Sequence, residues 1–188
     1  LEPLKQSIRN IAPLVKKGDL IVVESTVFPG TCEQVVLPLI ESISGLSHMD
    51  DFYLAHCPER VNPGDLYWNS SNIPRVVGAL TSVGVQIAAE FYASILGGEI
   101  YNVGNVRQSL SPKFSTDKGE LKVAQVGLGS VTMMRSIRDA EAVKAMENTV
   151  RDVNIAFVNE LAKISDVLNL DVVDIIDGMN ILIWIFNH

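Results

Sequence analysis

Residues 20–31 read LIVVESTVFPGT, and this stretch decides the fold class. Its first four residues form a continuous apolar run, which is typical of a strand buried on both faces of a parallel sheet. Phe28, Pro29 and Gly30 have the composition of a turn, and Thr31 can cap a following helix. The stretch therefore predicts a buried strand, a polar loop at its carboxyl end, and then a helix.

Short strands and helices alternate on both sides of this stretch. Helical spacing of apolar residues predicts a helix that starts near Leu4 and another over residues 82–96. Short apolar runs predict further strands at residues 52–55, 75–78 and 99–101. This alternation indicates an open α/β sheet, in which ligands bind at the carboxyl ends of the strands. The polar residues that follow positions 23 and 55 fall at such ends.

Residues 102–137 fit neither pattern and are predicted to be an irregular connection or insertion. Within them, residues 123–130 read VAQVGLGS and imitate the start of a dinucleotide-binding fingerprint. The third glycine is missing, because position 132 is a threonine. A lone GxG is a weak signal, so we do not expect this segment to bind the cofactor.

The last part of the chain is helical. From Asp139 to Leu168, apolar residues recur at steps of three and four, which predicts one long helix. Asp171 can cap a second, shorter helix that ends at Gly178. Residues 181–188 form an apolar tail that resembles a truncation point. The sequence therefore divides into residues 1–101, residues 102–137 and residues 138–188.

The composition excludes several classes of protein. The 188 residues carry a net charge of -7 and no basic run, which disfavours a nucleic-acid binder. No stretch reaches the roughly 18 apolar residues of a membrane span. The only cysteines, Cys32 and Cys57, are too few for a disulfide framework and indicate reduced thiols in a cytoplasmic protein.

Residues 56–65, HCPERVNPGD, gather chemically active side chains, and three interpretations compete. Cys57 could be a nucleophile with His56 as its base, but adjacent residues of a strand point to opposite faces. A zinc site would need further ligands, and none is in view, so no metal is predicted. The third interpretation gives the chemistry to Glu59, held rigidly between Pro58 and the turn that follows.

Lys144 and Asn148 are four residues apart on the long predicted helix and therefore share a face. The simpler interpretation is a solvated face. The alternative is that a lysine and an amide together bind an oxyanion or a phosphate-bearing substrate.

Three segments resemble the nucleotide-sugar 6-dehydrogenases, which act on UDP-glucose, UDP-N-acetylmannosamine or UDP-N-acetylglucosamine. Residues 24–31 are similar to their ESTVxPGT motif, residues 58–65 to PERxxPGD, and residues 140–160 to the start of their central helix. The resemblance implies an α/β fold: the second half of a Rossmann-like parallel sheet domain, followed by a long α-helical dimerisation segment. It also implies NAD as cofactor, a UDP-sugar as substrate and a homodimer formed through residues 139–168.

The family oxidises the C6 hydroxyl to a carboxylate with two NAD, through a thiohemiacetal and a thioester on a cysteine. By resemblance, Thr26 holds a catalytic water, Glu59 lies near C6, and Lys144 and Asn148 stabilise oxyanions. The predicted cofactor contacts are Glu24, Ser25 and Thr26. The predicted substrate contacts are Glu59, Arg60, Asn62, Lys144 and Asn148.

The departures from the family pattern matter as well. The GxGxxG fingerprint is expected before residue 1, and the nucleophilic cysteine, in a GGxC motif, after Asn180. We therefore expect an incomplete chain that is inactive alone. The PERxNPGD form favours the N-acetylhexosamine branch. Two alternatives stay open: a non-catalytic binding or dimerisation module, and a β-hydroxyacid dehydrogenase relative, against which the PERxNPGD turn speaks.

Overall fold

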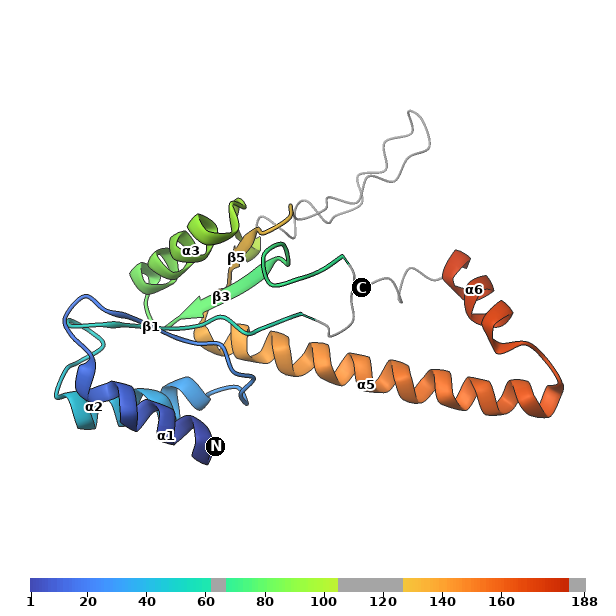
Figure 1. Cartoon of the computed structure of the whole chain (residues 1–188), viewed down its shortest axis with the longest axis horizontal. Coiled ribbons are helices and arrows are strands. Elements are labelled where there is room, and N and C mark those ends of the chain that lie inside the picture. Colours follow the sequence, from blue (N-terminus) through green and yellow to red (C-terminus); the bar gives the residue numbers. More distant parts are fainter. Residues whose placement is uncertain (62–66, 105–126, 183–188) are drawn as a thin grey trace. The chain divides into compact units, whose positions relative to one another are not determined.

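The computed structural model describes residues 1–61, 67–104 and 127–182. The chain divides into two compact units, Leu1–Ala145 and Met146–His188. The first unit is an α/β domain, and the second contains helices in its described part (Figure 1). The predicted α/β class is thereby confirmed.

The first unit is built on a five-stranded sheet in the order β1-β2-β3-β5-β4. Its strands are β1 (Leu20–Val23), β2 (Tyr53–His56), β3 (Arg75–Ala79), β4 (Ile100–Asn102) and β5 (Val131–Met133). The pairs β1–β2, β3–β5 and β4–β5 are parallel, whereas β2 and β3 are antiparallel. The predicted Rossmann-like parallel sheet is therefore confirmed except at this one pair. The described residues between β2 and β3 include no helix, and an antiparallel pair needs no helical crossover.

This reversal places the start of β3 at the same edge of the sheet as the ends of β1 and β2. In the register, Ala55 lies opposite Ala79 and His56 opposite Gly78. Arg75, the first residue of β3, therefore lies beside the loop that follows His56. This edge carries the polar segments of the sequence.

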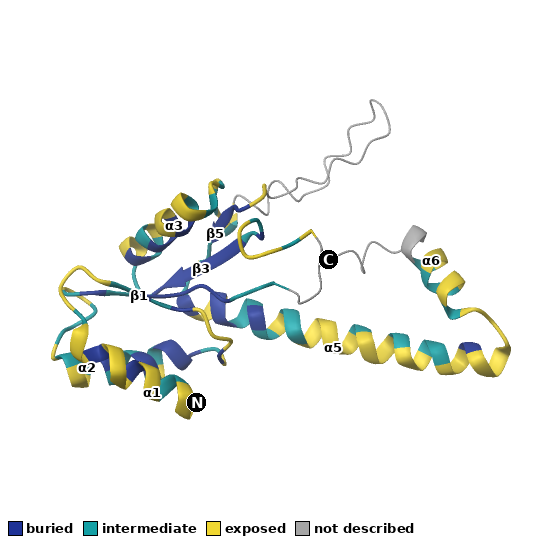
Figure 2. Cartoon of the chain, viewed as in Figure 1, coloured by how far each residue is buried: buried dark blue, intermediate teal, exposed yellow. Residues whose placement is uncertain are grey.

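Helices cover both faces of the sheet (Figure 1). On one side lie α1 (Glu2–Ile11), the 3-10 turn η1 (Ala12–Leu14), the π-helical turn η2 (Cys32–Val36) and α2 (Leu37–Ser44). Ile8, Val36 and Ile40 pack there against alternate strand residues such as Ile21 and Leu54. On the other side lies α3 (Ser82–Leu96), whose alanines pack against Ala55, Val77 and Val131. Each face of the sheet thus carries its own apolar core (Figure 2).

The predicted helix over residues 82–96 is confirmed with its bounds. Thr81 caps it by accepting a hydrogen bond from the Gly84 N–H at 3.0 Å, and Gly97 ends it in the left-handed conformation with φ 71°. The prediction that Thr31 caps a helix was wrong. Its hydroxyl turns back and donates to the carbonyl oxygen of Phe28 at 2.6 Å.

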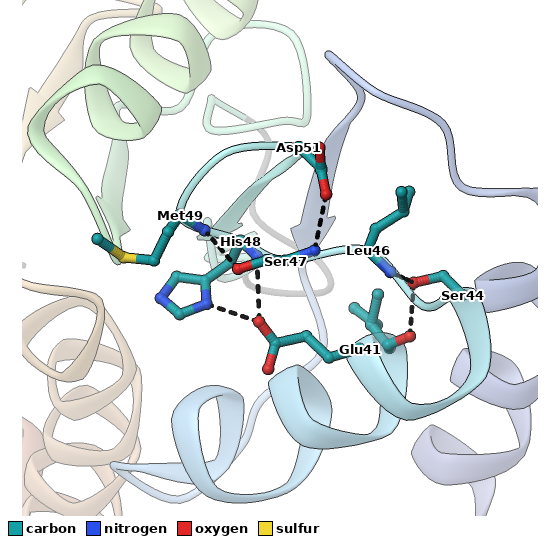
Figure 3. A network of polar contacts seen from close by, with 8 residues as sticks. Glu41, Ser44, Leu46, Ser47, His48, Met49 and Asp51 are labelled. Atoms are coloured by element: carbon teal, nitrogen blue, oxygen red, sulfur yellow. Dashed lines mark hydrogen bonds and ion pairs between the residues drawn. The ribbon is translucent and has the colours of Figure 1, made fainter.

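A network of polar contacts fixes the loop between α2 and β2 (Figure 3). One carboxylate oxygen of Glu41 accepts from the backbone N–H of His48 at 3.1 Å and meets its Nδ1 at 2.8 Å. The Ser47 N–H donates to Asp51, and the Leu46 N–H donates to the Ser44 hydroxyl. Side chains thereby satisfy backbone groups that the loop leaves outside the sheet.

The strand β5 was not predicted. It lies within the segment expected to be irregular, yet it occupies an interior position between β3 and β4. A tight turn precedes it, in which Gly129 has φ 66°. A Cβ on Gly98 would lie 2.2 Å from the Gly129 carbonyl, so these glycines permit a close approach of two backbones. Residues 123–126 of the imitated fingerprint lie outside the described residues.

The long predicted helix is confirmed as α5 (Ile137–Leu168), which crosses from the first unit into the second. It is followed by α6 (Val172–Leu182), whose first turn is capped by Asp171 through the Val173 N–H at 2.8 Å. The helix α6 continues past Gly178, the predicted end. Among the described residues, none of the helices combines the length and apolar character that crossing a membrane requires.

Candidate active site at the carboxyl ends of β1 and β2

The backbone pairing of β1 with β2 continues beyond both strands into the polar loops. The Cys57 N–H donates to the Val23 carbonyl at 3.1 Å, and the Glu59 N–H donates to the Glu24 carbonyl at 3.2 Å. Two segments that are distant in sequence, residues 24–31 and the segment that begins at Pro58, are therefore joined at one edge of the sheet. This pairing is the basis of the candidate site.

Glu24, Ser25 and Thr26 follow β1 and are exposed, whereas Val27 is buried and anchors the loop. The Glu24 carboxylate accepts a hydrogen bond of 2.5 Å from the hydroxyl of Tyr92, a buried residue of α3. Burial, the neighbouring Cys57 and Glu24 itself raise the pKa of Tyr92 above its ordinary value. The phenol is therefore protonated at neutral pH and acts as the donor.

Glu59 is held by backbone groups of its own loop, whereas the turn expected after it lies outside the described residues. Its Oε1 accepts from the backbone N–H groups of Arg60 and Val61 at 2.8 and 2.6 Å. Its Oε2 lies 3.6 Å from Nη1 of Arg75, and 45% of the Glu59 side chain is exposed. The two hydrogen bonds to Oε1 orient the carboxylate, and the side chain remains partly exposed.

Arg75 and Tyr92 belong to the site although no motif pointed to them. The Arg75 side chain is only 9% exposed, and its guanidinium lies 5.9 Å from the centre of the Tyr92 ring. Within the described part of the chain, its Nε and Nη1 have no hydrogen-bond partner. The sequence features that could have indicated these two residues are an arginine at the first position of an apolar strand and a tyrosine among the apolar residues of a helix.

Arg60 and Asn62, the other predicted substrate contacts of this loop, have different outcomes. Nη1 of Arg60 donates to the carbonyl oxygen of Pro74 at 3.1 Å, which links this loop to the residue before β3. Asn62 lies outside the described residues. Contact of either residue with a substrate stays a prediction.

His56 and Cys57 are both fully buried. Burial raises the pKa of the Cys57 thiol to about 12, and it lowers the pKa of His56. At neutral pH the thiol is therefore protonated and a poor nucleophile. This agrees with the sequence-based preference for Glu59 over a cysteine–histidine pair.

The start of α5 is part of the first unit and is packed against it. Ile137, Ala140 and Glu141 are buried, and Lys144 is 8% exposed. The interpretation of Lys144 as part of a solvated face is therefore wrong. Asn148 follows one helical turn later, in the second unit. A role of these two residues in binding an oxyanion stays a prediction, as does the role of Thr26.

Comparison with known families identifies both parts of the chain. The NAD binding domain of the UDP-glucose/GDP-mannose dehydrogenase family matches residues 1–96, and the central domain of the same family matches residues 138–183. The two matches flank the segment that contains β5.

Individual relatives agree with these matches. The UDP-N-acetyl-D-glucosamine 6-dehydrogenase of Salmonella typhi is 33% identical over 91% of this chain, which covers 33% of that protein. The solved structure of the UDP-D-ManNAc dehydrogenase from Pyrococcus horikoshii is 30% identical with a TM-score of 0.72, over 96% of this chain and 35% of that one. A UDP-N-acetyl-mannosamine dehydrogenase from Staphylococcus aureus gives 32% identity and a TM-score of 0.69, over 95% and 35%. The chain spans about a third of the length of the curated relatives that it matches.

Proposed function

Because this chain belongs to the UDP-glucose/GDP-mannose dehydrogenase family, we propose that it supplies part of an NAD-dependent enzyme that oxidises the C6 hydroxyl of a UDP-N-acetylhexosamine to the carboxylate. The observation that carries the proposal is the backbone hydrogen bond from the Glu59 N–H to the Glu24 carbonyl oxygen. This bond joins the two loops that follow β1 and β2. The names of the relatives, which include N-acetylglucosamine and N-acetylmannosamine dehydrogenases, support the N-acetylhexosamine branch.

The loop after β1 fits a nicotinamide cofactor. Glu24, Ser25 and Thr26 are polar and exposed at the carboxyl end of a parallel strand, where such sheets bind nucleotides. A bound NAD would supply the acceptor for the hydride lost from C6. The contribution of this chain is to orient the loop: Tyr92 holds the Glu24 carboxylate, and the buried Val27 fixes the backbone next to Thr26.

Glu59 and Lys144 have complementary roles in this proposal. The carboxylate oxygen Oε2 of Glu59 accepts a proton from a water that Thr26 positions, which is the general-base step of thioester hydrolysis. The ammonium group of Lys144, assisted by Asn148, stabilises the negative charge that develops on the substrate oxygen. Arg60 and Asn62 contact the sugar.

Neither cysteine of this chain suits the nucleophilic step. Cys32 and Cys57 are fully buried, and burial raises the pKa of both thiols. We therefore expect the isolated chain to produce no sustained NADH from a UDP-sugar. Sustained turnover by the isolated chain would contradict this expectation.

A homodimer through α5 is the second element of the proposal. Beyond residue 145, this helix exposes a row of large apolar side chains at steps of three, four and seven, which is the pattern of a helix that packs against another helix. The row comprises Met146, Val150, Val153, Phe157, Ile164 and Leu168, each at least 45% exposed. Assembly through this row and a cytoplasmic location both stay predictions.

A hybrid enzyme tests the proposal directly. The third of the Pyrococcus horikoshii dehydrogenase that matches this chain is replaced by residues 1–182, and NADH formation is followed with UDP-N-acetylmannosamine, UDP-N-acetylglucosamine and UDP-glucose. We expect turnover of an N-acetylhexosamine substrate. Glu59→Gln and Lys144→Met should each lower kcat by about 10²-fold or more.

Controls separate the alternative functions. Glu160→Gln changes an exposed glutamate of α5 and should leave the rate of the hybrid unchanged. A folded, dimeric hybrid without activity would favour a non-catalytic dimerisation module. Oxidation of a small β-hydroxy acid in preference to a UDP-sugar would favour the β-hydroxyacid dehydrogenase alternative.

A further inference from the structure

The helix that follows the Thr26 loop begins without a cap of its own. The N–H groups of a first helical turn have no partners within the helix and need acceptors from elsewhere. Thr31, the residue before η2, directs its hydroxyl to the Phe28 carbonyl instead. The first N–H group of the η2–α2 helix, that of Cys32, therefore depends on an acceptor from another part of the chain.

That acceptor is Glu141 of α5. Its side chain is fully buried; Oε2 accepts from the Gly30 N–H at 2.5 Å, and Oε1 accepts from the Cys32 N–H at 2.8 Å. A buried carboxylate is costly unless such hydrogen bonds compensate for its lost hydration. The positive end of the helix dipole stabilises the same charge. Glu141 thus caps η2–α2 from more than a hundred residues away in the sequence.

The start of α5 is also fixed from the side of the sheet. A Cβ on Gly78 of β3 would lie 2.3 Å from the carbonyl oxygen of Ser136, so the backbones of β3 and of the residue before α5 are in direct contact. The side chain of Ala140 lies 3.0 Å from the same Cβ position. The first turn of α5 is therefore held between β3 on one side and the Gly30 turn on the other.

We propose that Glu141 is a positioning residue, which fixes Lys144 relative to the loop of residues 24–31. The two residues are three apart on α5 and lie on one face of it, so a displacement of Glu141 also displaces Lys144. Gly30 makes the contact possible, because its φ of 95° presents its N–H to the carboxylate at no steric cost. The roles of Lys144 and Thr26 in catalysis rest on the proposed function, whereas the contact itself does not.

The two cysteines provide reporters of the contact in the 188-residue chain. Both are fully buried, but Cys32 donates its N–H to Glu141, whereas Cys57 lies in the core on the other face of the sheet. We expect Glu141→Ala to raise the rate of Cys32 modification by a thiol reagent at least about tenfold and to leave Cys57 protected, because opening is local. Equal exposure of both thiols would mean global unfolding and would overturn the proposal.

A second measurement separates the effect of a displaced helix from the effect of the lost Glu141 charge. Glu141 also helps to raise the pKa of Cys32, after burial, so loss of its charge can activate the thiol without movement. Labelling of Lys144 by an amine reagent provides this second measurement, with the exposed Lys16, which lies outside α5, as internal reference. We expect the Lys144 labelling rate to increase in the order wild type, Glu141→Gln, Glu141→Ala. Glutamine should be intermediate because it keeps the size and one acceptor oxygen.

Glu160→Gln is the matched control, since it removes the charge of an exposed glutamate from the same helix. It should leave the labelling of Cys32 and of Lys144 unchanged. An unchanged Lys144 rate in Glu141→Ala would overturn the positioning role even if Cys32 became reactive.

Kinetics of the hybrid enzyme connect the contact to catalysis. Glu141→Gln should lower kcat by about tenfold with a change in the sugar KM of less than about threefold, because only the placement of a transition-state contact is lost. Glu141→Gln combined with Lys144→Met should be no slower than Lys144→Met alone, and an additive loss would overturn the role. If the hybrid lacks all activity, the proposed function fails, and the labelling rates still decide whether Glu141 positions Lys144.

Discussion

The backbone N–H of Glu59 donates to the carbonyl oxygen of Glu24 at 3.2 Å, one residue beyond the end of β1 and three residues beyond the end of β2. The pairing of β1 with β2 therefore sets the distance between the two acidic loops. The carboxylates are then oriented separately, Glu24 by the Tyr92 hydroxyl and Glu59 by two backbone N–H groups.

Arg75 offers a test of function against stability. Its buried guanidinium makes one ion pair, at 3.6 Å, and leaves two nitrogens without a hydrogen-bond partner among the described residues. Replacing such a group by an apolar side chain of similar volume is often neutral or stabilising. We expect Arg75→Met to change the free energy of unfolding, measured in urea, by less than about 1 kcal/mol.

The same variant should lower the activity of the hybrid enzyme by about tenfold or more, because Oε2 of Glu59 loses its neighbouring charge. Arg138→Met, which removes a mostly exposed arginine paired with Glu33, is the control for loss of one positive charge. Equal activities of the two variants would show that Arg75 has no part in the site.

Acid should weaken the loop between α2 and β2. The hydrogen bonds from the side chain and then the backbone of His48 lower the pKa of Glu41 below its ordinary value of 4.5. A carboxyl group with a lowered folded-state pKa stabilises the protein above its unfolded-state pKa, and this contribution disappears as the pH falls through the folded-state pKa. Glu41→Gln should therefore flatten the decline in stability below about pH 4.5.

Urea unfolding at a series of pH values measures this effect. The wild type and Glu41→Gln should differ most at neutral pH and converge as the pH falls. A constant difference across the acidic range would show that the contacts in Figure 3 do not contribute through the charge of Glu41.

Two glycine-to-alanine substitutions should have opposite effects. Gly78→Ala would place a methyl group 2.3 Å from the Ser136 carbonyl, where backbone must move, and should destabilise by more than about 2 kcal/mol. Gly178→Ala lies within α6 with open space around the new Cβ, and should stabilise that helix by roughly 0.5–1 kcal/mol. Thermal unfolding followed by circular dichroism compares the two variants. If Gly78→Ala were as stable as the wild type, the tight contact of β3 with the start of α5 would be contradicted.

Charge within the apolar row of α5 should prevent self-association. Val153 is 61% exposed. Val153→Asp should therefore change the free energy of unfolding little if the helix is solvated, and should weaken association strongly if the helix packs against a second copy. We expect sedimentation velocity to show a dimer for the wild type and a monomer for Val153→Asp. Glu160→Gln should still dimerise, and a monomeric wild type at high concentration would contradict assembly through α5.

Strong local signals explain which parts of the fold could be predicted. The helix α3 has a capping threonine and a terminal glycine, and β1 has four apolar residues in a row, so both were found within a residue. The strand β5 has three residues and no pattern of its own. Its place in the sheet comes from pairing with β3 and β4, which are remote in sequence. The antiparallel step between β2 and β3 is likewise set by tertiary pairing.

The same reason limits prediction of the site. Glu59 stood out because the sequence around it is rich in proline and glycine, and two backbone N–H groups of its loop hold the carboxylate in place. Arg75, Tyr92 and Glu141 act on residues that are distant in sequence, and no local pattern marks such pairs. Thr31 has the right side chain for a cap, but a remote carboxylate takes that role.

The hydrogen bonds from the Gly30 and Cys32 N–H groups to Glu141 limit which insertions and deletions the protein can tolerate. Each residue of an α-helix adds a rotation of about 100° and a rise of about 1.5 Å. One residue inserted between Glu141 and Lys144 would therefore turn the lysine away from the face that the carboxylate anchors. The same insertion before Glu141 would detach the carboxylate from the turn. The number of residues in the first turns of α5 is therefore constrained as strictly as the identity of Glu141 and Lys144.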